Sequence, residues 1–208
     1  MYLFNRTRVA HPAHASAALS FAAEIAVKAS TLSGTEINAW YAVMSPASGA
    51  IVWTAWFECL ADWEVAAEKL AADPAYNHMV EMSDSYFTGP VTDGMATIVS
   101  PFPTVTERAE YVTIVSTVAA NGQIAEAAEH GLAIAATASR IEGLTTMFAM
   151  NVTGPYGGVS WMTGAPSIGA MDKSLAAINS SAEFATLVDS GGHLYQGQAT
   201  QTTYRRLI

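Results

Sequence analysis

The spacing of apolar positions changes along the first hundred residues and predicts a series of short elements. Residues 2–9 form an apolar strand candidate, and residues 12–33 carry small apolar side chains at helical spacing before Gly34. Two apolar segments, 37–44 and 49–58, are typical of hairpin strands joined by a Ser-Pro-Ala-Ser-Gly turn. Residues 62–82 predict a second helix, with Asp62 as its N-cap and an interruption at Pro74. Residues 94–100 predict a closing strand.

The same order of elements recurs in the second half of the chain. Residues 110–120 predict a strand, and Asn121 is the expected cap of a helix that ends before Gly143. A hairpin over 144–152 and 158–165, a helical segment over 167–192 and a strand over 199–208 complete the repeat. The sequence therefore predicts two domains, 1–100 and 110–208, joined by a proline-containing linker over 101–109.

Each half has the order strand, helix, strand, strand, helix, strand. This order places the helices on one face of a four-stranded antiparallel sheet and leaves the other face open. Two such units in tandem can cover each other's open faces. The predicted fold class is therefore α+β, with two ferredoxin-like βαββαβ repeats whose antiparallel sheets pack face to face.

One run carries a family resemblance. It is GAIVWTAWFECLADWEVAAEKLAADPAYNHM, with a weaker copy in GVSWMTGAPSIGAMDKSLAAINSSAEFATLV. An aromatic strand, a short turn, a helix and an Asp-Pro-x-Tyr motif in this order resemble the dimeric α+β barrel superfamily of ferredoxin-like proteins, in its fused tandem-repeat form. Members include cofactor-independent monooxygenases of antibiotic biosynthesis, haem-degrading enzymes and stress-responsive proteins. The resemblance implies the fold more strongly than any one activity.

Net charge and composition limit the classes of partner that the protein is expected to bind. Nine basic residues against eighteen acidic ones give a net charge of −9, which disfavours nucleic acid and an anionic membrane surface. Only 13% of the residues are charged, so we expect part of the surface to be covered in a homodimer. The chain has two long uncharged stretches, 37–57 and 143–171, but each is broken by a Pro/Gly/Ser cluster, and no transmembrane span is expected. A single cysteine and the absence of a long apolar run at the start predict a cytoplasmic protein.

The first repeat is the better host for a ligand site, because it holds His78 and most of the tryptophans. We expect a pocket between its sheet and helices, with Asn5, Tyr41 and Trp56 binding a small apolar or aromatic molecule. His78 is the predicted catalytic group, which moves a proton. The resemblance implies a cofactor-independent monooxygenase or an isomerase. The alternative is a non-catalytic binding or structural module in which the aromatic side chains form the core.

Metals and cofactors have little support in the sequence. The haem-degrading branch of the superfamily implies iron ligation by His78 with help from Asn5, but Leu70 stands where that branch has a helix tryptophan. His11 and His14 are three residues apart without a third ligand nearby. We therefore expect no metal and no cofactor.

The remaining reactive side chains have ordinary structural interpretations. Cys59 belongs to no CxxC pair and is expected to be buried and inert, and His130 is expected to be a solvated helix residue. No GxSxG, Walker, GxGxxG or HExxH motif is present, so hydrolases, P-loop NTPases, dinucleotide enzymes and zincins lack their usual signatures.

Overall fold

The computed structural model describes residues 1–101 and 108–208, so most of the predicted linker over 101–109 lies outside the described residues. The chain forms two compact units, Met1–Met95 with Tyr204–Ile208 as unit 1 and Ala96–Thr203 as unit 2. The closing strand of each half begins in one unit and ends in the other. The last part of β4 pairs with β6 of unit 2, and the end of β8 lies beside β2 of unit 1, where Leu207 N–H donates to the Ala39 carbonyl at 2.8 Å.

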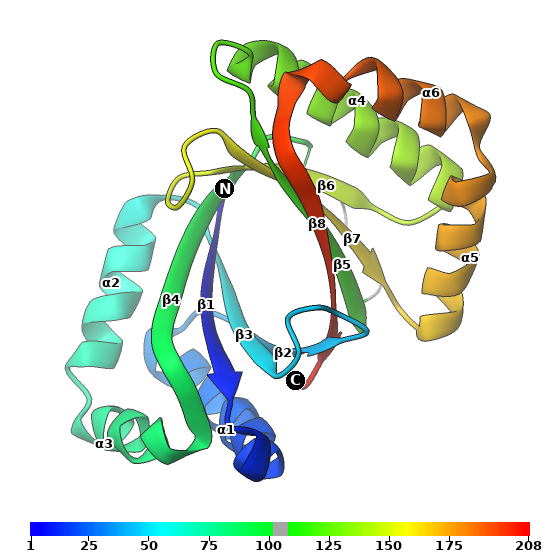
Figure 1. Cartoon of the computed structure of the whole chain (residues 1–208). Coiled ribbons are helices and arrows are strands. Elements are labelled where there is room, and N and C mark those ends of the chain that lie inside the picture. Colours follow the sequence, from blue (N-terminus) through cyan, green and yellow to red (C-terminus); the bar gives the residue numbers. More distant parts are fainter. Residues whose placement is uncertain (102–107) are drawn as a thin grey trace. The chain divides into compact units, whose positions relative to one another are not determined.

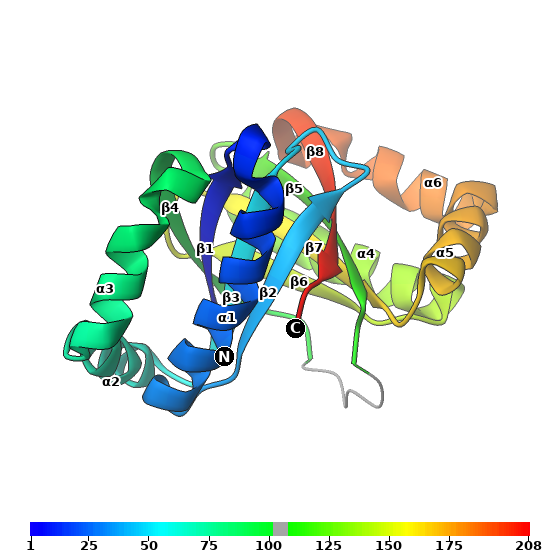
Figure 2. The ribbon, with the colours of Figure 1, turned by 90° about the horizontal axis from the view of Figure 1, so that it is seen from below.

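Unit 1 is a four-stranded sheet covered by helices on one face (Figures 1 and 2). Its elements are β1 (Tyr2–Ala10), α1 (Ala15–Ser33), β2 (Ile37–Val43), β3 (Ala50–Phe57), α2 (Leu60–Ala71), α3 (Pro74–Met82) and β4 (Phe87–Ile98), with short 3-10 turns at Pro12–His14 (η1) and Ser83–Tyr86 (η2). The strand order is β4-β1-β3-β2, and β3 pairs antiparallel with both β1 and β2. The first and third strands of the chain, β1 and β3, are therefore the central pair of this sheet.

The helices of unit 1 begin and end where local chemistry requires. Helix α1 buries a stripe of small residues and ends at Gly34, whose φ of 78° is the left-handed conformation that glycine adopts without strain. The predicted second helix is two helices, because Asp73 caps a new helix that starts at Pro74. The sequence predicted Asp62 as the N-cap of α2. Asp62 is instead the third residue of this helix, and its carboxylate accepts a hydrogen bond from the N–H of Cys59 at 3.2 Å.

Unit 2 repeats this order. Its elements are β5 (Tyr111–Ala119), α4 (Ile124–Glu142), β6 (Thr146–Asn151), β7 (Gly158–Ala165), α5 (Ile168–Ser180), α6 (Ala182–Ser190), a 3-10 turn at Gly192–Leu194 (η3) and β8 (Tyr195–Arg206). The strand order is β8-β5-β7-β6, with antiparallel pairing of β7 to β5 and β6. An α+β architecture with antiparallel sheets is therefore confirmed, whereas packing of the two sheets face to face stays a prediction.

Three sequence predictions for the elements were wrong in detail. Gln123, not Asn121, is the N-cap of α4. The helical segment of unit 2 is broken at Ser181, whose hydroxyl accepts from the Phe184 N–H and starts α6. Cys59 is exposed, because it occupies the turn before α2 rather than the strand core.

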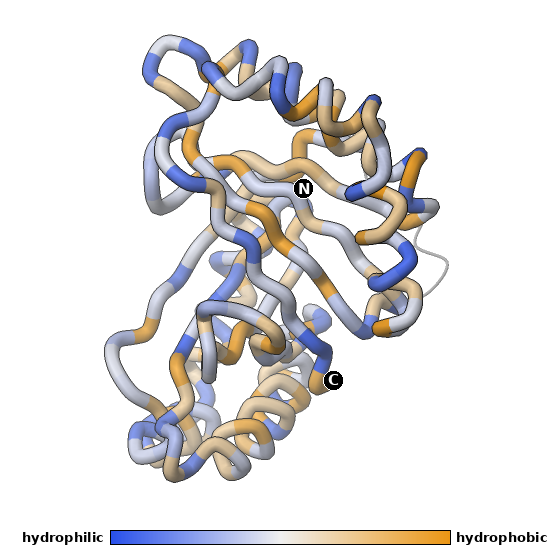
Figure 3. The backbone as a smooth tube through the Cα atoms, turned by 45° about the vertical axis from the view of Figure 1, so that its right-hand side comes forward, coloured by the Kyte–Doolittle hydropathy of each residue, from blue (hydrophilic) through white to orange (hydrophobic). Residues whose placement is uncertain are grey.

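Apolar and hydrophilic positions alternate along the strands and helices of the backbone (Figure 3). This pattern is the basis of the correct assignment of element types from the sequence. Among the described residues, no helix is both long and apolar enough to cross a membrane.

Candidate functional site

A cavity of about 390 Å³ lies between the sheet and the helices of unit 1. Its walls are mainly apolar, and six aromatic residues contribute to them: Phe4, Phe21, Trp53, Phe57, Trp63 and Tyr76. Ligand sites commonly combine such an apolar wall with a few polar groups that fix orientation. The cavity lies in the unit and the layer where the sequence predicted a pocket.

Strand alternation decides which side chains reach the cavity. Successive side chains of a strand point to opposite faces, so Phe4, Arg6 and Arg8 of β1 share the face that meets the helices. On β3 the same face carries Trp53, whose indole N–H donates to the Ala22 carbonyl of α1 at 3.0 Å. This hydrogen bond satisfies the polar atom of a buried tryptophan and fixes one wall.

Small side chains on the helices leave the cavity open. Ala26 and Ala29 of α1 and Ala66 of α2 are buried and line it. An alanine on a helix face toward a sheet leaves room that a leucine or phenylalanine would fill. The Ala-rich composition of α1, which predicts a helix from sequence, therefore also creates the space for a ligand.

Arg6 and Tyr76 form one polar part of the cavity wall, and Asp93 binds Arg6 from outside the lining. Arg6 donates from Nε and Nη2 to the two carboxylate oxygens of Asp93 at 2.8 and 2.7 Å, and this hydrogen bonding raises the pKa of Arg6. Burial raises the pKa of the Tyr76 phenol, although the nearby Arg6 charge lowers it. Tyr76 therefore stays protonated at neutral pH and can donate a hydrogen bond into the cavity.

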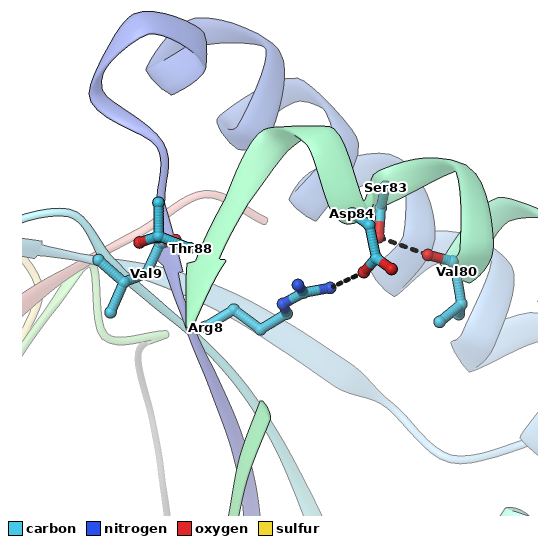
Figure 4. A network of polar contacts seen from close by, with 6 residues as sticks. All are labelled: Arg8, Val9, Val80, Ser83, Asp84 and Thr88. Carbon is cyan, nitrogen blue, oxygen red and sulfur yellow. Dashed lines mark hydrogen bonds and ion pairs between the residues drawn. The ribbon is translucent and has the colours of Figure 1, made fainter. Parts of the chain in front are cut away.

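Arg8 forms a second polar group. Its side chain is only 11% exposed, and its guanidinium carbon lies 4.5 Å from the centre of the Phe87 ring. Nη1 donates to Asp84 of η2 at 3.2 Å, as Figure 4 shows. The Nε of Arg8 is buried and has no hydrogen-bond partner, which is found for no other side-chain atom in the described part of the chain.

The four residues predicted from sequence do not line this cavity. Asn5 lies on the opposite face of β1, where its amide is so close to Gly94 that a Cβ there would be 2.8 Å from Nδ2. Trp56 likewise faces away on β3 and lines a different cavity of about 340 Å³ near the start of α2. Tyr41 packs against the core beside α1, and its hydroxyl accepts from Arg205 at 3.5 Å. His78 is exposed on α3.

Helical geometry explains the position of His78. Tyr76 and Val80 are four residues apart on α3 and both line the cavity, whereas His78 lies midway between them and therefore on the opposite side of the helix. Sequence reasoning missed Arg8 and Tyr76. The signal was available for Arg8, since alternation from Phe4 along β1 places it on the cavity face.

Unit 2 carries different side chains at three matching strand positions. Phe148 of β6 stands where unit 1 has Ala39, is fully buried, and lies 5.4 Å from Trp161 between ring centres. It packs so closely on α4 that a Cβ at Gly131 would be 2.3 Å from its ring. Val115 and Thr117 stand where unit 1 has Arg6 and Arg8.

His130 of α4 is half-buried and is not the solvated residue that the sequence predicted. Its Nδ1 and the Tyr195 hydroxyl are 3.0 Å apart, and its Nε2 is 2.8 Å from the Leu187 carbonyl oxygen. The Tyr195 hydroxyl also donates to the Ala127 carbonyl at 3.2 Å. The arrangement joins α4, α6 and β8 from within.

Tyr195 predicts a specific loss of stability in alkali. Burial raises the pKa of its phenol to about 12, from an ordinary value of 10.0. A raised pKa in the folded state contributes stability that is complete below pH 10 and is lost as the pH rises from 10 to 12. Urea unfolding at pH 9 and pH 11 should therefore show a larger fall in the unfolding free energy for the wild type than for Tyr195→Phe. Equal falls would contradict this role.

Metal binding has no structural support in this part of the molecule. The described residues contain no group of three or more His, Cys, Asp or Glu side chains that could hold a metal ion. His11 and His14 do lie together, with ring centres 5.3 Å apart, but the Nδ1 of His11 accepts from the Ala13 N–H as a cap of η1.

No family model and no curated protein sequence matches the chain. Solved structures do match. A proposed monooxygenase from Fusobacterium nucleatum has a TM-score of 0.74 at 9% identity, with 100% of this chain and 92% of that one covered. An anthrone oxidase-like protein has a TM-score of 0.70 at 12% identity, with 99% and 90% covered. A proposed monooxygenase from Lactobacillus acidophilus has a TM-score of 0.67 at 10% identity, with 100% and 94% covered.

The chain has a ferredoxin-like α+β fold. The likeness to these structures agrees with the α+β fold class predicted from the sequence. At these identities the likeness shows the fold alone. What the cavity binds has to be argued from its own residues.

Proposed function

We propose that this protein binds a small, largely apolar and aromatic molecule in the cavity of unit 1. The observation that carries the proposal is the open cavity of about 390 Å³, whose aromatic wall is interrupted by Arg6, Arg8 and Tyr76. A purely structural core would close such a space, since protein interiors are packed as densely as organic crystals.

We further infer that the two units are tandem repeats of one ferredoxin-like module, of which the first kept a ligand site. The shared element order supports this, as do the matching hydrogen bonds from Trp53 to the Ala22 carbonyl and from Trp161 to the Gly131 carbonyl. The second repeat has Phe148 where the first has Ala39, and it has no charged side chain at the positions of Arg6 and Arg8. Assembly as a cytoplasmic homodimer stays a prediction.

The reaction that suits this site is that of a cofactor-independent monooxygenase. Isomerisation is an alternative that can begin with the same step. Both can begin with loss of a proton from a carbon beside a carbonyl group, which leaves negative charge on the carbonyl oxygen. The protonated Tyr76 phenol can donate a hydrogen bond to that oxygen and stabilise the charge. The names of the matched structures, two proposed monooxygenases and an anthrone oxidase-like protein, favour this chemistry.

A non-catalytic binding module is the second candidate, and one observation favours it. Among the described residues that line the cavity there is no carboxylate, histidine or cysteine. A general base would normally come from one of these side chains. Asp93 reaches the cavity only through Arg6, and both of its carboxylate oxygens already accept hydrogen bonds from that guanidinium.

Oxygen uptake with anthrone tests the proposal. In this reaction the ring CH₂ becomes a C=O, one oxygen atom of O₂ enters the product, and the other leaves as water with the two hydrogens. We expect the purified chain to accelerate anthraquinone formation over a heat-denatured control, without added cofactor. Binding of anthrone or of the neutral aromatic 2-naphthamide without turnover would favour the binding module. Failure of both molecules to bind would contradict the binding of a neutral aromatic ligand in this cavity.

A further inference from the structure

Arg8 is a buried cation whose charge is only partly balanced. It extends from β1 toward η2, where Asp84 accepts a hydrogen bond from it at 3.2 Å and is its one hydrogen-bonded side chain among residues 1–101 and 108–208 (Figure 4). Asp84 is 79% exposed, so much of its charge is solvated and little is available to stabilise Arg8. Phe87 supplies a ring face but no acceptor.

The unsatisfied part of Arg8 is one edge of its guanidinium. Nη1 binds Asp84, whereas Nε is buried and donates to no described residue. Buried N–H groups of native proteins are nearly always satisfied, and each exception requires an explanation. The free edge belongs to a residue that lines the cavity, so a molecule in the cavity can supply the missing acceptor.

Arg6, two residues earlier on the same face of β1, shows what completes such an edge. Its Nε and Nη2 bind the two oxygens of one carboxylate, that of Asp93, at 2.8 and 2.7 Å. The Nε edge of a guanidinium is matched by two oxygens in one plane, which is carboxylate geometry. Arg8 offers the same edge without a protein carboxylate to meet it.

The fold itself does not need a cation at this position. Unit 2 has Thr117 at the corresponding place in β5 and forms the same order of elements. Arg6 is already neutralised by Asp93, so Arg8 is the cavity's cation with an unsatisfied N–H. One partly balanced cation suits a monoanion such as a carboxylate better than a phosphate dianion, which requires more donors.

We propose that the ligand of the unit 1 cavity is an aromatic carboxylic acid, whose carboxylate accepts from the Nε edge of Arg8 while its ring packs on the aromatic wall. This inference rests on the proposed function and names the ligand class. It also explains a buried N–H without an acceptor in an otherwise apolar pocket, because the ligand carboxylate accepts from the Nε of Arg8.

Two probes of equal size test the proposal in the full chain. 2-Naphthoate carries the carboxylate, and 2-naphthamide is its neutral counterpart. By isothermal titration calorimetry we expect the wild type to bind 2-naphthoate about tenfold more tightly than 2-naphthamide. Arg8→Met should reduce 2-naphthoate binding to the level of the amide. Arg140→Met, which removes an exposed partner of Glu183 in unit 2, should leave both affinities unchanged.

The outcomes distinguish failure of the carboxylate inference from failure of the ligand site itself. Equal binding of the two probes by the wild type overturns the carboxylate inference and leaves an aromatic ligand site in place. Loss of both probes in Arg8→Met, with a folded circular dichroism spectrum, would also overturn it, because Arg8 would then shape the cavity rather than bind an anion. If neither probe binds the wild type, the ligand site itself fails. Should Arg8→Met not fold, the wild-type comparison still decides.

Discussion

Arg8→Met is expected to stabilise the protein while it removes anion binding. Methionine fills a volume similar to the arginine stem and takes no charge into the apolar cavity. A buried donor without a partner costs about 1–3 kcal/mol, and replacing a buried ion by a well-packed apolar side chain is often stabilising. We expect the midpoint of thermal unfolding to rise by about 2–4 °C for each kcal/mol gained in a chain of this length. Differential scanning calorimetry measures the change.

Arg6→Met is the matched control. It removes a cation from the same face of β1, but this cation is bound bidentately to Asp93, which would lose its partner. Both side chains of that pair are partly exposed, so a small loss of stability is expected and a gain is not. A fall in the melting temperature of Arg8→Met, equal to or larger than that of Arg6→Met, would mean that Arg8 stabilises the fold and is not present to bind a ligand.

Ala29→Phe should abolish ligand binding at little cost to stability. Ala29 is a buried residue of α1 that lines the cavity, so a phenyl ring there enters empty space instead of a packed core. The buried ring gains contacts that offset the strain, and we expect the unfolding free energy to change by less than about 1 kcal/mol. Titration with 2-naphthoate should show no binding.

Ala138→Phe makes the same substitution at the corresponding helix position of unit 2. Ala138 is 3% exposed and lies about one turn from Ala135 of the packed core and from Glu142. Overpacking there should cost about 3 kcal/mol, with ligand binding by the folded fraction unchanged. The helix propensity of phenylalanine affects both variants alike. Equal destabilisation by the two substitutions would show that the unit 1 cavity is not available to a side chain.

The order of elements could be predicted from sequence because it depends on local signals. Periodicity, Pro74 and the two glycines Gly34 and Gly143 mark the helices and their ends. Ser181 breaks the second helical segment without a proline, and a serine alone is too common to predict a new helix start. The early starts of β4 and β8 were missed, because residues 89–93 and 196–198 are exposed and include glycine and polar side chains.

The location of the site in the first repeat could be predicted from the sequence, but the residues that line it could not. Choosing by residue type favoured a histidine and tryptophans, but His78 and Trp56 face away from the cavity on their helix and strand. Arg8 resembles any charged residue of a half-exposed strand in the sequence. Its buried Nε becomes evident only when β4, η2 and the helices are packed around it. The absence of a partner is a property of tertiary structure.

A crystal structure of the full chain with 2-naphthoate tests the central claim most directly. We predict the naphthalene ring in the cavity of unit 1 beside Trp53, with both carboxylate oxygens within hydrogen-bond distance of the Nε edge of Arg8. A ligand found elsewhere on the chain, or a cavity closed by movement of α1 or α2 onto the sheet, would contradict the account.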